Sequence, residues 1–378
     1  MTSKQLYKYL IFILISFPLN AQKAVFELDS IQKLLTPEVK NIIAKDISNK
    51  RIVFLGESEH HIGSDFLAKT EFVKYLVIEQ GYKNIAFESD FFALYFEHEQ
   101  KNTFPFWSKS VQCEELFKFL KEHNVIIWGF DNQFSTSYTF STFSKQLFNF
   151  LQQNNIMIEE RFKNIVEKIM KNGSTINKVI SENDLDYIDN QIDIILKNSS
   201  ILDNPEWNQF IQSFKSTVLQ YTSSKKIGKQ IRDSQMAKNL NFVTNKLPNE
   251  KFIVWAANAH ISKLDEDYME NQTMGYQYNQ LNPGITFHIA FAPIKMPYRT
   301  EKFINTQQKD KNNLLSLLPD INHNFFIDSQ LFFEANPLYK DKNFEGMFGA
   351  GMGNDNTVWF KHFDALVFIS NGEKVKYP

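Results

Sequence analysis

Acidic and imidazole side chains follow four separate apolar runs in this sequence. They are Glu57 with His60, Glu88, Asp131 and His260, placed after residues 51–55, 85–87, 125–128 and 252–256. An imidazole has an unperturbed pKa of roughly 6.5, so it is a natural general base near neutral pH, and a neighbouring carboxylate fixes its tautomer and raises its basicity. His60, flanked by Glu57 and Glu88, suits that role.

Short apolar runs of this kind predict strands that are buried on both faces. Between the first two runs, Phe66, Val73 and Leu76 recur at helical spacing, in a segment that Gly63 opens and Gly81 closes. This order predicts a strand, helix, strand unit with parallel strands. Because ligands bind at the carboxyl ends of the strands in open α/β sheets, we expect the polar side chains to share one cleft.

The rest of the chain continues the alternation of strands and helices. Further strands are predicted over residues 285–291, 325–327 and 365–369, and a further helix over 227–246. Residues from about 139 to 222 show the apolar spacing of helices and no strand signal. This insertion suits a lid or wall of the cleft and a scaffold equally. The predicted fold is α/β, a largely parallel central sheet flanked by helices with a mainly helical insertion, in a single domain over 23–378.

The composition excludes several classes of protein. The chain has 378 residues, 43% of them hydrophobic, which is enough for a large core. Its net charge of -2 and the lack of a long basic run predict no nucleic-acid binding. The single cysteine, Cys113, offers no intrachain disulfide. The 37 phenylalanines are expected to fill the core.

The first 22 residues have the features of a secretory signal peptide. Lys4 and Lys8 precede an apolar stretch, residues 10–17, that is too short to span a bilayer, and Pro18 and Ala21 follow it. A buried N-terminal helix is the alternative, but charge, apolar run and small residue stand in the order that export requires. No cysteine lies near the cleavage site, so we expect a periplasmic or secreted protein without a lipid anchor or membrane span.

Each candidate residue also has a structural interpretation. Glu57 suits the start of a helix, where a carboxylate is favoured. Asp131 suits a turn, and His260 suits a hydrogen-bonded structural histidine. Glu88 differs because it directly follows three apolar strand residues, where an unpaired carboxylate is costly, and this favours a functional role.

Three mechanisms can be weighed against these residues. A serine or cysteine nucleophile lacks support, because there is no Gly-x-Ser-x-Gly phrase and Cys113 lies in a polar segment. A metal site has suitable ligands but neither HExxH nor paired CxxC spacing. Direct activation of water by His60 needs the fewest additional parts, with Arg232 stabilising the oxyanion. Asp233 is interpreted as the ion-pair partner of Arg232.

Seven phrases resemble, in this order, the erythromycin esterase family: IVFLGESEHH, AFES, GFDNQ, IRDSQMAKN, WAANAH, MGYQ and FDALVFI. They extend over roughly residues 45 to 375. The resemblance implies a metal-independent hydrolase without a cofactor, in which a histidine activates water against an ester. It assigns the general base to His60, the carboxylates to Glu57 and Glu88, and the remaining catalytic positions to Arg232 and His260.

The sequence departs from the family pattern at three places. His61 replaces a common glycine, Ala257 replaces the first histidine of a His-Asn-x-His phrase, and Lys69 stands where some members have arginine. A lysine offers no bidentate fork. These departures leave the predicted hydrolytic residues unchanged but affect the prediction of the substrate. The resemblance therefore does not imply that macrolides are cleaved. Lys69, Asp131 and Asn258 are predicted to bind the substrate.

The expected function is hydrolysis of a small-molecule carboxylic ester or lactone by an exported enzyme, with the ester and the oligomeric state left open. The wider superfamily that the resemblance indicates offers two alternatives. One is a non-catalytic module that binds haem or another ligand, and the other is a metal-dependent hydrolase. The absent lipid-attachment cysteine and the retained Arg232 and His260 count against the binding module.

Overall fold

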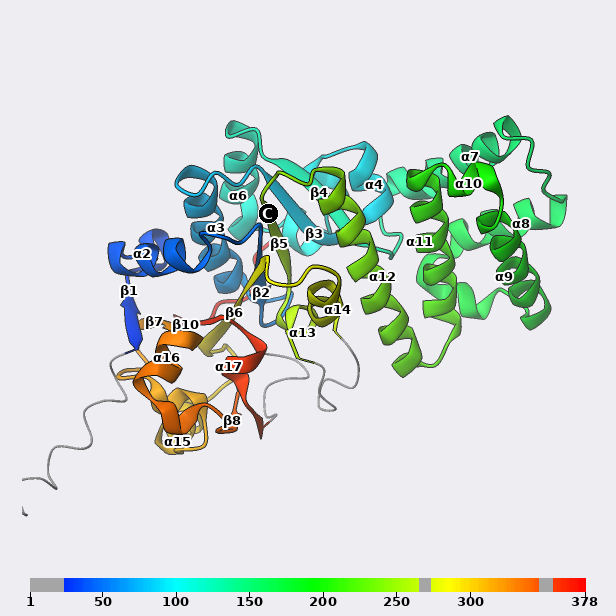
Figure 1. The fold of residues 1–378 in the computed structure, drawn as a ribbon. Coiled ribbons are helices and arrows are strands. Elements are labelled where there is room, and N and C mark those ends of the chain that lie inside the picture. The colour runs from blue at the N-terminus through cyan, green and yellow to red at the C-terminus, as the bar shows by residue number, and fades with distance from the viewer. Residues whose placement is uncertain (1–23, 265–272, 347–355) are drawn as a thin grey trace, which may run out of the picture.

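The computed structural model describes residues 24–264, 273–346 and 356–378, and within them one eight-stranded sheet and a two-stranded ribbon are present (Figure 1). The strand order of the sheet is β1-β7-β10-β6-β2-β5-β3-β4. The sheet strands are β1 (Val25–Leu28), β2 (Ile52–Glu57), β3 (Asn84–Asp90), β4 (Ile126–Asp131), β5 (Phe252–Ala257), β6 (Thr286–Lys295), β7 (Asn324–Asp328) and β10 (Ala365–Asn371), and the ribbon strands are β8 (Phe344–Glu345) and β9 (Asn356–Thr357).

The sheet is parallel from β10 through β6, β2, β5 and β3 to β4. At the other edge β7 runs antiparallel to β10, and β1 runs antiparallel to β7. The predicted α/β class with a largely parallel sheet is therefore confirmed. The sequence analysis did not find β1, a four-residue edge strand whose short apolar pattern gives little periodicity to detect.

The central strands are buried on both faces because helices cover both sides of the sheet. In β2, Ile52 and Phe54 belong to one hydrophobic core, whereas Val53 and Leu55 belong to the other, and all four are fully buried. This two-sided burial explains why the strands are continuous apolar runs rather than alternating ones.

Two sets of helices build these cores. One core receives side chains from α2 (Pro37–Asp46), α3 (Gly63–Ile78), α5 (Pro105–Ser108) and α6 (Val111–Glu122). The other core receives them from α4 (Phe91–Phe96), α12 (Lys225–Lys246), α13 (Asn258–Ile261), α14 (Met274–Leu281), α15 (Glu301–Lys309), α16 (Ser329–Ala335) and α17 (Trp359–His362).

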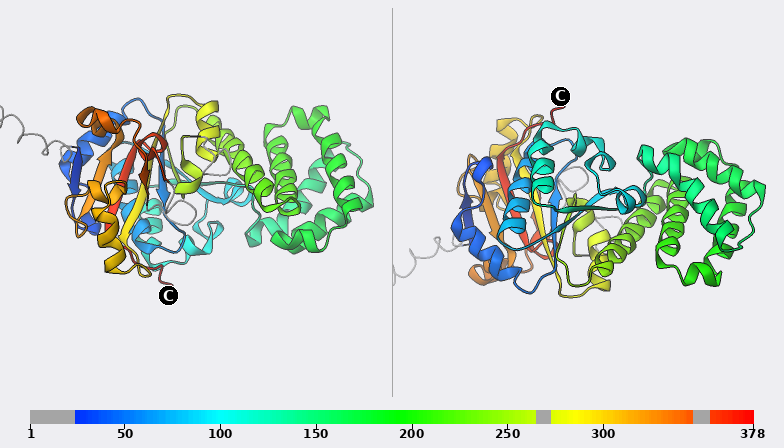
Figure 2. Two further views of the ribbon diagram at one scale, coloured as in Figure 1. Left: turned by 90° about the horizontal axis from the view of Figure 1, so that it is seen from below. Right: turned by 90° about the horizontal axis from the view of Figure 1, so that it is seen from above.

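Residues 137–222 form a helical lobe that projects beyond the β4 edge of the sheet, with α12 running along the boundary (Figures 1 and 2). The lobe contains α7 (Ser137–Gln153), α8 (Glu160–Asn172), the 3-10 helix η3 (Gly173–Lys178), α9 (Glu182–Leu196), α10 (Ser199–Leu202) and α11 (Pro205–Thr222). The insertion predicted at about 139–222 falls on this lobe. At its base Phe92 of α4 contacts Phe143 and Phe210 of the lobe, with ring centroids 5.0 and 5.1 Å apart.

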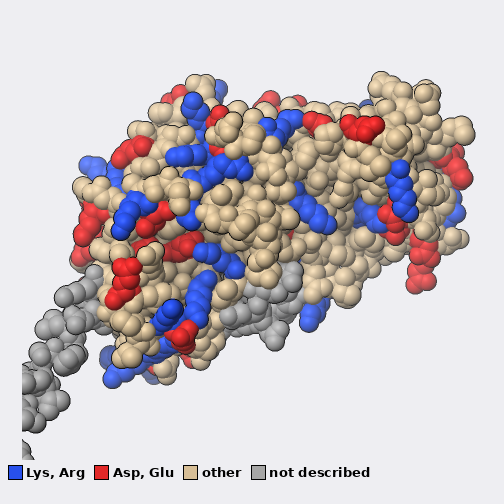
Figure 3. All heavy atoms as spheres, in the orientation of Figure 1, with Lys and Arg blue, Asp and Glu red and all other residues tan. Residues whose placement is uncertain are grey.

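Acidic and basic side chains are interspersed on the face seen in Figure 3. The expected lack of nucleic-acid binding stays a prediction. Among the helices that the structure describes, none combines the length and hydropathy that crossing a bilayer requires. The predicted signal peptide, residues 1–22, lies outside the described residues, so export also remains a prediction.

Candidate active site

The ends of four parallel strands lie side by side at one edge of the sheet. Glu57, the last residue of β2, is in register with Ala257 at the end of β5, and Phe87 of β3 is in register with both Trp255 and Gly129. The polar residues that follow these positions are thus brought to one place by strand register.

Glu88 lies in an irregular part of β3. The register between β3 and β4 shifts between Phe87 and Asp90, and an irregularity of this kind changes the direction of a side chain. Gly129 permits the close approach, because a Cβ atom there would lie 2.6 Å from the Asp90 carbonyl oxygen and 2.7 Å from that of Ser89. Oε2 of Glu88 accepts a hydrogen bond of 3.0 Å from the Ala257 N–H.

Glu57 and His60 form a hydrogen-bonded dyad. The distance from His60 Nδ1 to Glu57 Oε1 is 2.9 Å, and the same oxygen accepts from Trp107 Nε1 at 3.1 Å. The second oxygen, Oε2, accepts from the ammonium of Lys69. Because an ionised carboxylate can only accept, it favours the tautomer of His60 with the proton on Nδ1, and Nε2 is then the basic nitrogen.

Arg232 joins Glu88 to Asp131. Its Nη2 lies 2.7 Å from Glu88 Oε1 and 2.7 Å from Asp131 Oδ2, and its Nε donates to Asp131 Oδ1 at 3.2 Å. The two bonds to Asp131 make a bidentate pair, which fixes the plane of the guanidinium. Burial would lower the pKa of Arg232, but the charges of Asp131 and Glu88 outweigh it and raise that pKa well above its ordinary value.

His260 completes the cluster from the short helix α13. Its Nδ1 lies 2.7 Å from Asp233 Oδ1, in the geometry of an ion pair rather than of an aligned hydrogen bond. Its Nε2 lies 3.1 Å from Arg232 Nη1 and 3.4 Å from Glu88 Oε1, so this nitrogen faces a donor and an acceptor. The interpretation of Asp233 as the partner of Arg232 was wrong, since Arg232 pairs with Glu88 and Asp131.

A single atom, Glu88 Oε1, connects the cluster. His60 Nε2, Arg232 Nη2 and His260 Nε2 lie 4.0, 2.7 and 3.4 Å from it. Burial would raise the pKa of Glu88, but the positive charges of His260, Arg232 and His60 outweigh burial and hold that pKa far below its ordinary value. Glu88 is therefore ionised whenever the protein is folded near neutral pH.

The cationic members of the cluster are the accessible ones. The side chains of His60, His260 and Arg232 are 34, 19 and 16% exposed, whereas those of Glu57 and Glu88 are 0 and 1% exposed. Burial would lower the pKa of His60, but the hydrogen bond to Glu57 and the charge of Glu88 raise it above its ordinary value of 6.5. A ligand therefore meets two imidazoles and a guanidinium, with the carboxylates behind them.

The three residues predicted to bind substrate lie behind this surface. Lys69 is fully buried, with its ammonium against Glu57 and 3.9 Å from the ring centre of Trp255. Asn258 is also fully buried, and its side chain bonds to both backbone groups of Phe291 in β6. Asp131 is 1% exposed and holds Arg232. Their direct contact with a substrate stays a prediction, and in the structure each side chain supports a neighbouring part of the site.

Sequence analysis missed residues that contact the dyad or the turn that carries His60. The ring of Phe106 stacks on His60 with centroids 4.6 Å apart, and Trp107 donates to Glu57. Asp65 accepts from the N–H and the hydroxyl of Ser58 at 2.7 and 2.6 Å, and burial raises the pKa of Asp65 to about 7. No spacing rule links residues 106 and 107 to residue 60, so the sequence carries no signal for this contact.

Within the described residues, no group of three His, Cys, Asp or Glu side chains has the arrangement of a metal site. The cluster itself explains this, because the guanidinium of Arg232 already stands between Glu88 and Asp131. The ammonium of Lys69 does the same beside Glu57. The two acidic positions most suited to a cation are thus neutralised by the chain's own side chains.

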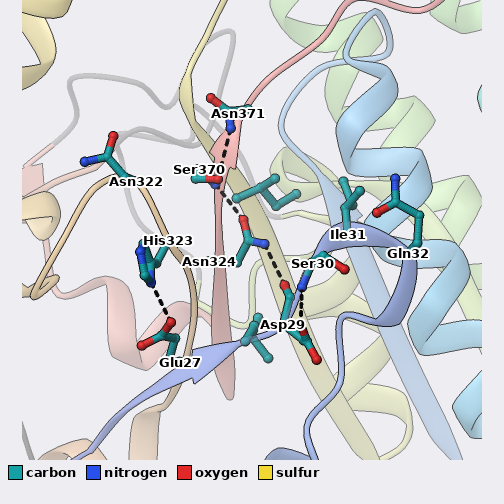
Figure 4. A pocket seen from close by; sticks show the side chains of 12 residues that line it. Glu27, Asp29, Ser30, Ile31, Gln32, Asn322, His323, Asn324, Ser370 and Asn371 are labelled. Atoms are coloured by element: carbon teal, nitrogen blue, oxygen red, sulfur yellow. Dashed lines mark hydrogen bonds and ion pairs between the residues drawn. The ribbon is translucent and has the colours of Figure 1, made fainter.

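A pocket of about 440 Å³ lies elsewhere, against β1, β7 and β10 (Figure 4). Several of its polar groups bond to one another. His323 Nδ1 lies 2.5 Å from Glu27 Oε1, and the side-chain amide of Asn324 donates to the Asp29 carbonyl at 2.8 Å. None of the residues predicted from the sequence lines it, so we place the candidate site at the ends of β2, β5, β3 and β4.

Comparison with known proteins identifies a matching family and a related putative hydrolase. The sequence model of the erythromycin esterase family matches residues 77–292, which include Glu88, Asp131, Arg232 and His260 but begin after Glu57 and His60. The putative hydrolase YbfO of Bacillus subtilis is 25% identical over 280 residues, which are 64% of this chain and 61% of that protein. The chain thus spans less than two thirds of the length of that relative.

Solved structures share the fold at low sequence identity. A succinoglycan biosynthesis protein is 14% identical with a TM-score of 0.74, covering 94% of this chain and 96% of its own. A mutant of the erythromycin esterase EreC in its open conformation is 13% identical with a TM-score of 0.68, covering 93% and 98%. The family resemblance inferred from the sequence phrases is confirmed. Because the family model matches more than half of the chain, this protein belongs to the erythromycin esterase family.

Proposed function

We propose that this protein is an exported, metal-independent hydrolase that cleaves a carboxylic ester or lactone with water activated by His60. The observation that carries the proposal is the convergence of His60, Arg232 and His260 on Glu88 Oε1, at 4.0, 2.7 and 3.4 Å. The family membership and the similarity to a putative hydrolase of Bacillus subtilis support hydrolysis as the reaction.

In the proposed mechanism each step belongs to a named atom. Nδ1 of His60 donates to Glu57, so Nε2 takes a proton from a water molecule held near Glu88. The hydroxide adds to the ester carbonyl, and the oxyanion is stabilised by Arg232 and His260, which both reach the accessible surface. When the tetrahedral intermediate collapses, the proton on His60 passes to the leaving alkoxide, and the base is restored.

The side chains already present favour a mechanism without metal. Glu57 and Glu88 are each paired with a cation of the chain, Lys69 and Arg232. A metal ion would have to displace these groups. Export is supported by the order of features in residues 1–22.

His60→Gln tests the mechanism, and His61→Gln is the matched control, because His61 is the exposed neighbour whose side chain has no assigned role. We expect His60→Gln to lower kcat on simple aryl esters and lactones by at least about 10²-fold, since a general base contributes about 10²–10⁴-fold. His61→Gln should retain turnover. Undiminished hydrolysis in folded His60→Gln would refute the proposal.

Two further experiments test the alternatives of a metal-dependent hydrolase and a haem-binding module. Turnover after dialysis against a chelator should be unchanged, and its loss with recovery on adding Zn²⁺ would indicate a metal-dependent hydrolase. Titration with haem should give no Soret shift, and saturable binding without ester turnover would indicate a binding module.

A further inference from the structure

A groove of about 750 Å³ separates the strand-end loops from the helical lobe. Phe104 and Gln133 line it on the side of the sheet, and Phe140, Met170 and Tyr221 line it on the side of the lobe. Its volume lies within the range of about 300–1,000 Å³ that is usual for small-molecule sites. None of the side chains in the catalytic cluster lines this groove.

The groove nevertheless begins beside both halves of the cluster. The ring of Phe104 stacks on Phe106 with centroids 5.2 Å apart, and Phe106 stacks on His60 at 4.6 Å. On the other half, the N–H of Gln133 donates to Asp131 Oδ1 at 3.1 Å, and Asp131 holds Arg232. Phe104 and Gln133 therefore place one end of the groove next to the residues that contact His60 and Arg232.

The lining combines aromatic rings and uncharged polar side chains with one cation. Phe140 is 38% exposed, so its ring is accessible to a molecule in the groove. Lys171, at the end of α8, is the charged residue of a lining that otherwise consists of uncharged side chains. In the part of the chain that the structure describes, no carboxylate forms an ion pair with Lys171.

We infer that this groove binds the part of the ester substrate remote from its reacting carbonyl, and that it selects an extended apolar body ending in an acidic group. The apolar rings would cover the body, and Lys171 would pair with the acid. The inference rests on the proposed function for the reaction, but the binding it assigns to the groove can be measured without turnover.

Two variants test the groove. Ser174→Trp places a large ring in it from an exposed lining position, and Lys171→Gln removes its charge. Ser199→Trp and Lys168→Gln are the matched controls, because both original side chains lie on the same lobe and do not line the groove. Circular dichroism would confirm that each variant is folded.

The substrates are 4-nitrophenyl acetate, 4-nitrophenyl dodecanoate and the mono-4-nitrophenyl ester of dodecanedioic acid. We expect Ser174→Trp to lower kcat/KM for both long esters at least about tenfold and to leave the acetate unaffected, since lost apolar contacts cost about 10–200-fold. Lys171→Gln should lower only the value for the acid-ended ester, by about fivefold, as expected for one exposed ion pair. Equal effects on the short and long esters, or none on the long ones, would overturn the inference.

Direct binding separates this inference from the proposed function. The probe 8-anilinonaphthalene-1-sulfonate combines aromatic rings with an acid, and its fluorescence rises when it is bound. We expect Ser174→Trp to remove binding and Lys171→Gln to weaken it, while both controls and His60→Gln keep it. This result would support the groove even if no ester is cleaved, whereas identical binding by all variants would contradict it.

Discussion

At the scale of single residues, the site is built around two buried carboxylates that hold three cationic or basic groups at the surface. Glu57 orients His60, and Glu88 lies within 4.0 Å of both imidazoles and the guanidinium. The charge of Glu88 stabilises the protonated form of either histidine. The pH dependence of the reaction should therefore report on this arrangement.

We expect kcat/KM to rise with pH through a midpoint above 6.5. In the proposed mechanism His60 acts as a base only when it is neutral. Its pKa is raised above 6.5, so the active form accumulates only as the pH passes that raised value. Glu57→Gln removes the charged partner and should move the midpoint to lower pH. The pH profile of initial rates measures both effects.

Asp65 provides the control for this assignment, because burial raises its pKa to about 7 and it titrates in the same range. Asp65→Asn should leave the rising limb in place. If the rising limb disappeared in Asp65→Asn and stayed unshifted in Glu57→Gln, it would report the titration of Asp65, and its assignment to His60 would be wrong.

Trp107→Phe tests a positioning residue that touches no substrate. The change removes the N–H that donates to Glu57 Oε1 and keeps an aromatic ring. A hydrogen bond to a charged group contributes about 1.5–3 kcal/mol, so we expect kcat to fall about tenfold or more with KM little changed. Without this donor more of the charge of Glu57 acts on His60, and the rising limb should move to higher pH.

Trp207→Phe is the matched control, since Trp207 lies in the helical lobe and stacks on Phe150. An unshifted pH profile in Trp107→Phe would show that this tryptophan serves packing alone.

At the scale of elements, the turn that carries His60 is held by the C-terminal segment, residues 372–378. The Val375 N–H donates to the His61 carbonyl at 3.0 Å, and the Gly63 N–H donates to the Glu373 carbonyl at 2.7 Å. Ile62 and Lys374 form an isolated antiparallel bridge. The segment after the last strand thus holds the part of the turn that leads from His60 into α3.

Removal of residues 373–378 should therefore loosen His60 while the sheet remains intact. We expect kcat to fall at least about tenfold, because small displacements of a catalytic group cost up to about 10²-fold. Hydrogen exchange at the amides of residues 60–64 should become faster. Removal of residues 377 and 378 alone keeps the three contacts and should have little effect, and equal activity of the two truncated proteins would contradict the assigned role.

At the scale of the whole molecule, the helical lobe and the sheet share one hydrophobic core. Phe210 of α11 packs on Phe91, Phe92 and Tyr95 of α4, with ring centroids 5.0–5.4 Å apart. Polar contacts join the same boundary, since Asp90 at the end of β3 accepts from the hydroxyl groups of two threonines at the start of α7. We expect such a continuous core to unfold as one unit.

Phe210→Ala should lower the free energy of unfolding by about 3–5 kcal/mol, the usual cost of removing a buried phenylalanine. Calorimetry should show one transition at a lower Tm for both lobe and sheet. Phe303→Ala, at a side chain that is 42% exposed, is the control and should cost much less. Two separate transitions would instead identify the lobe as an independent domain.

Several features of this protein could be predicted from the sequence because they depend on local patterns. Buried parallel strands are continuous apolar runs, and the residues that follow them must lie at one edge of the sheet. This reasoning predicts from the sequence alone that Glu57, His60, Glu88 and His260 lie close together. The order of the family phrases further identified the family, since those phrases surround the same strand ends.

The tertiary structure alone decided which partner each side chain has. Lys69 follows Glu57 by 12 positions and could have faced the cleft, but packing turns it into the core against Trp255. Trp107 and residues 373–376 meet the His60 turn only because helices and the final strand bring them there. Contacts between distant segments depend on how the elements pack against one another. The spacing of residues along one strand or helix therefore does not predict them.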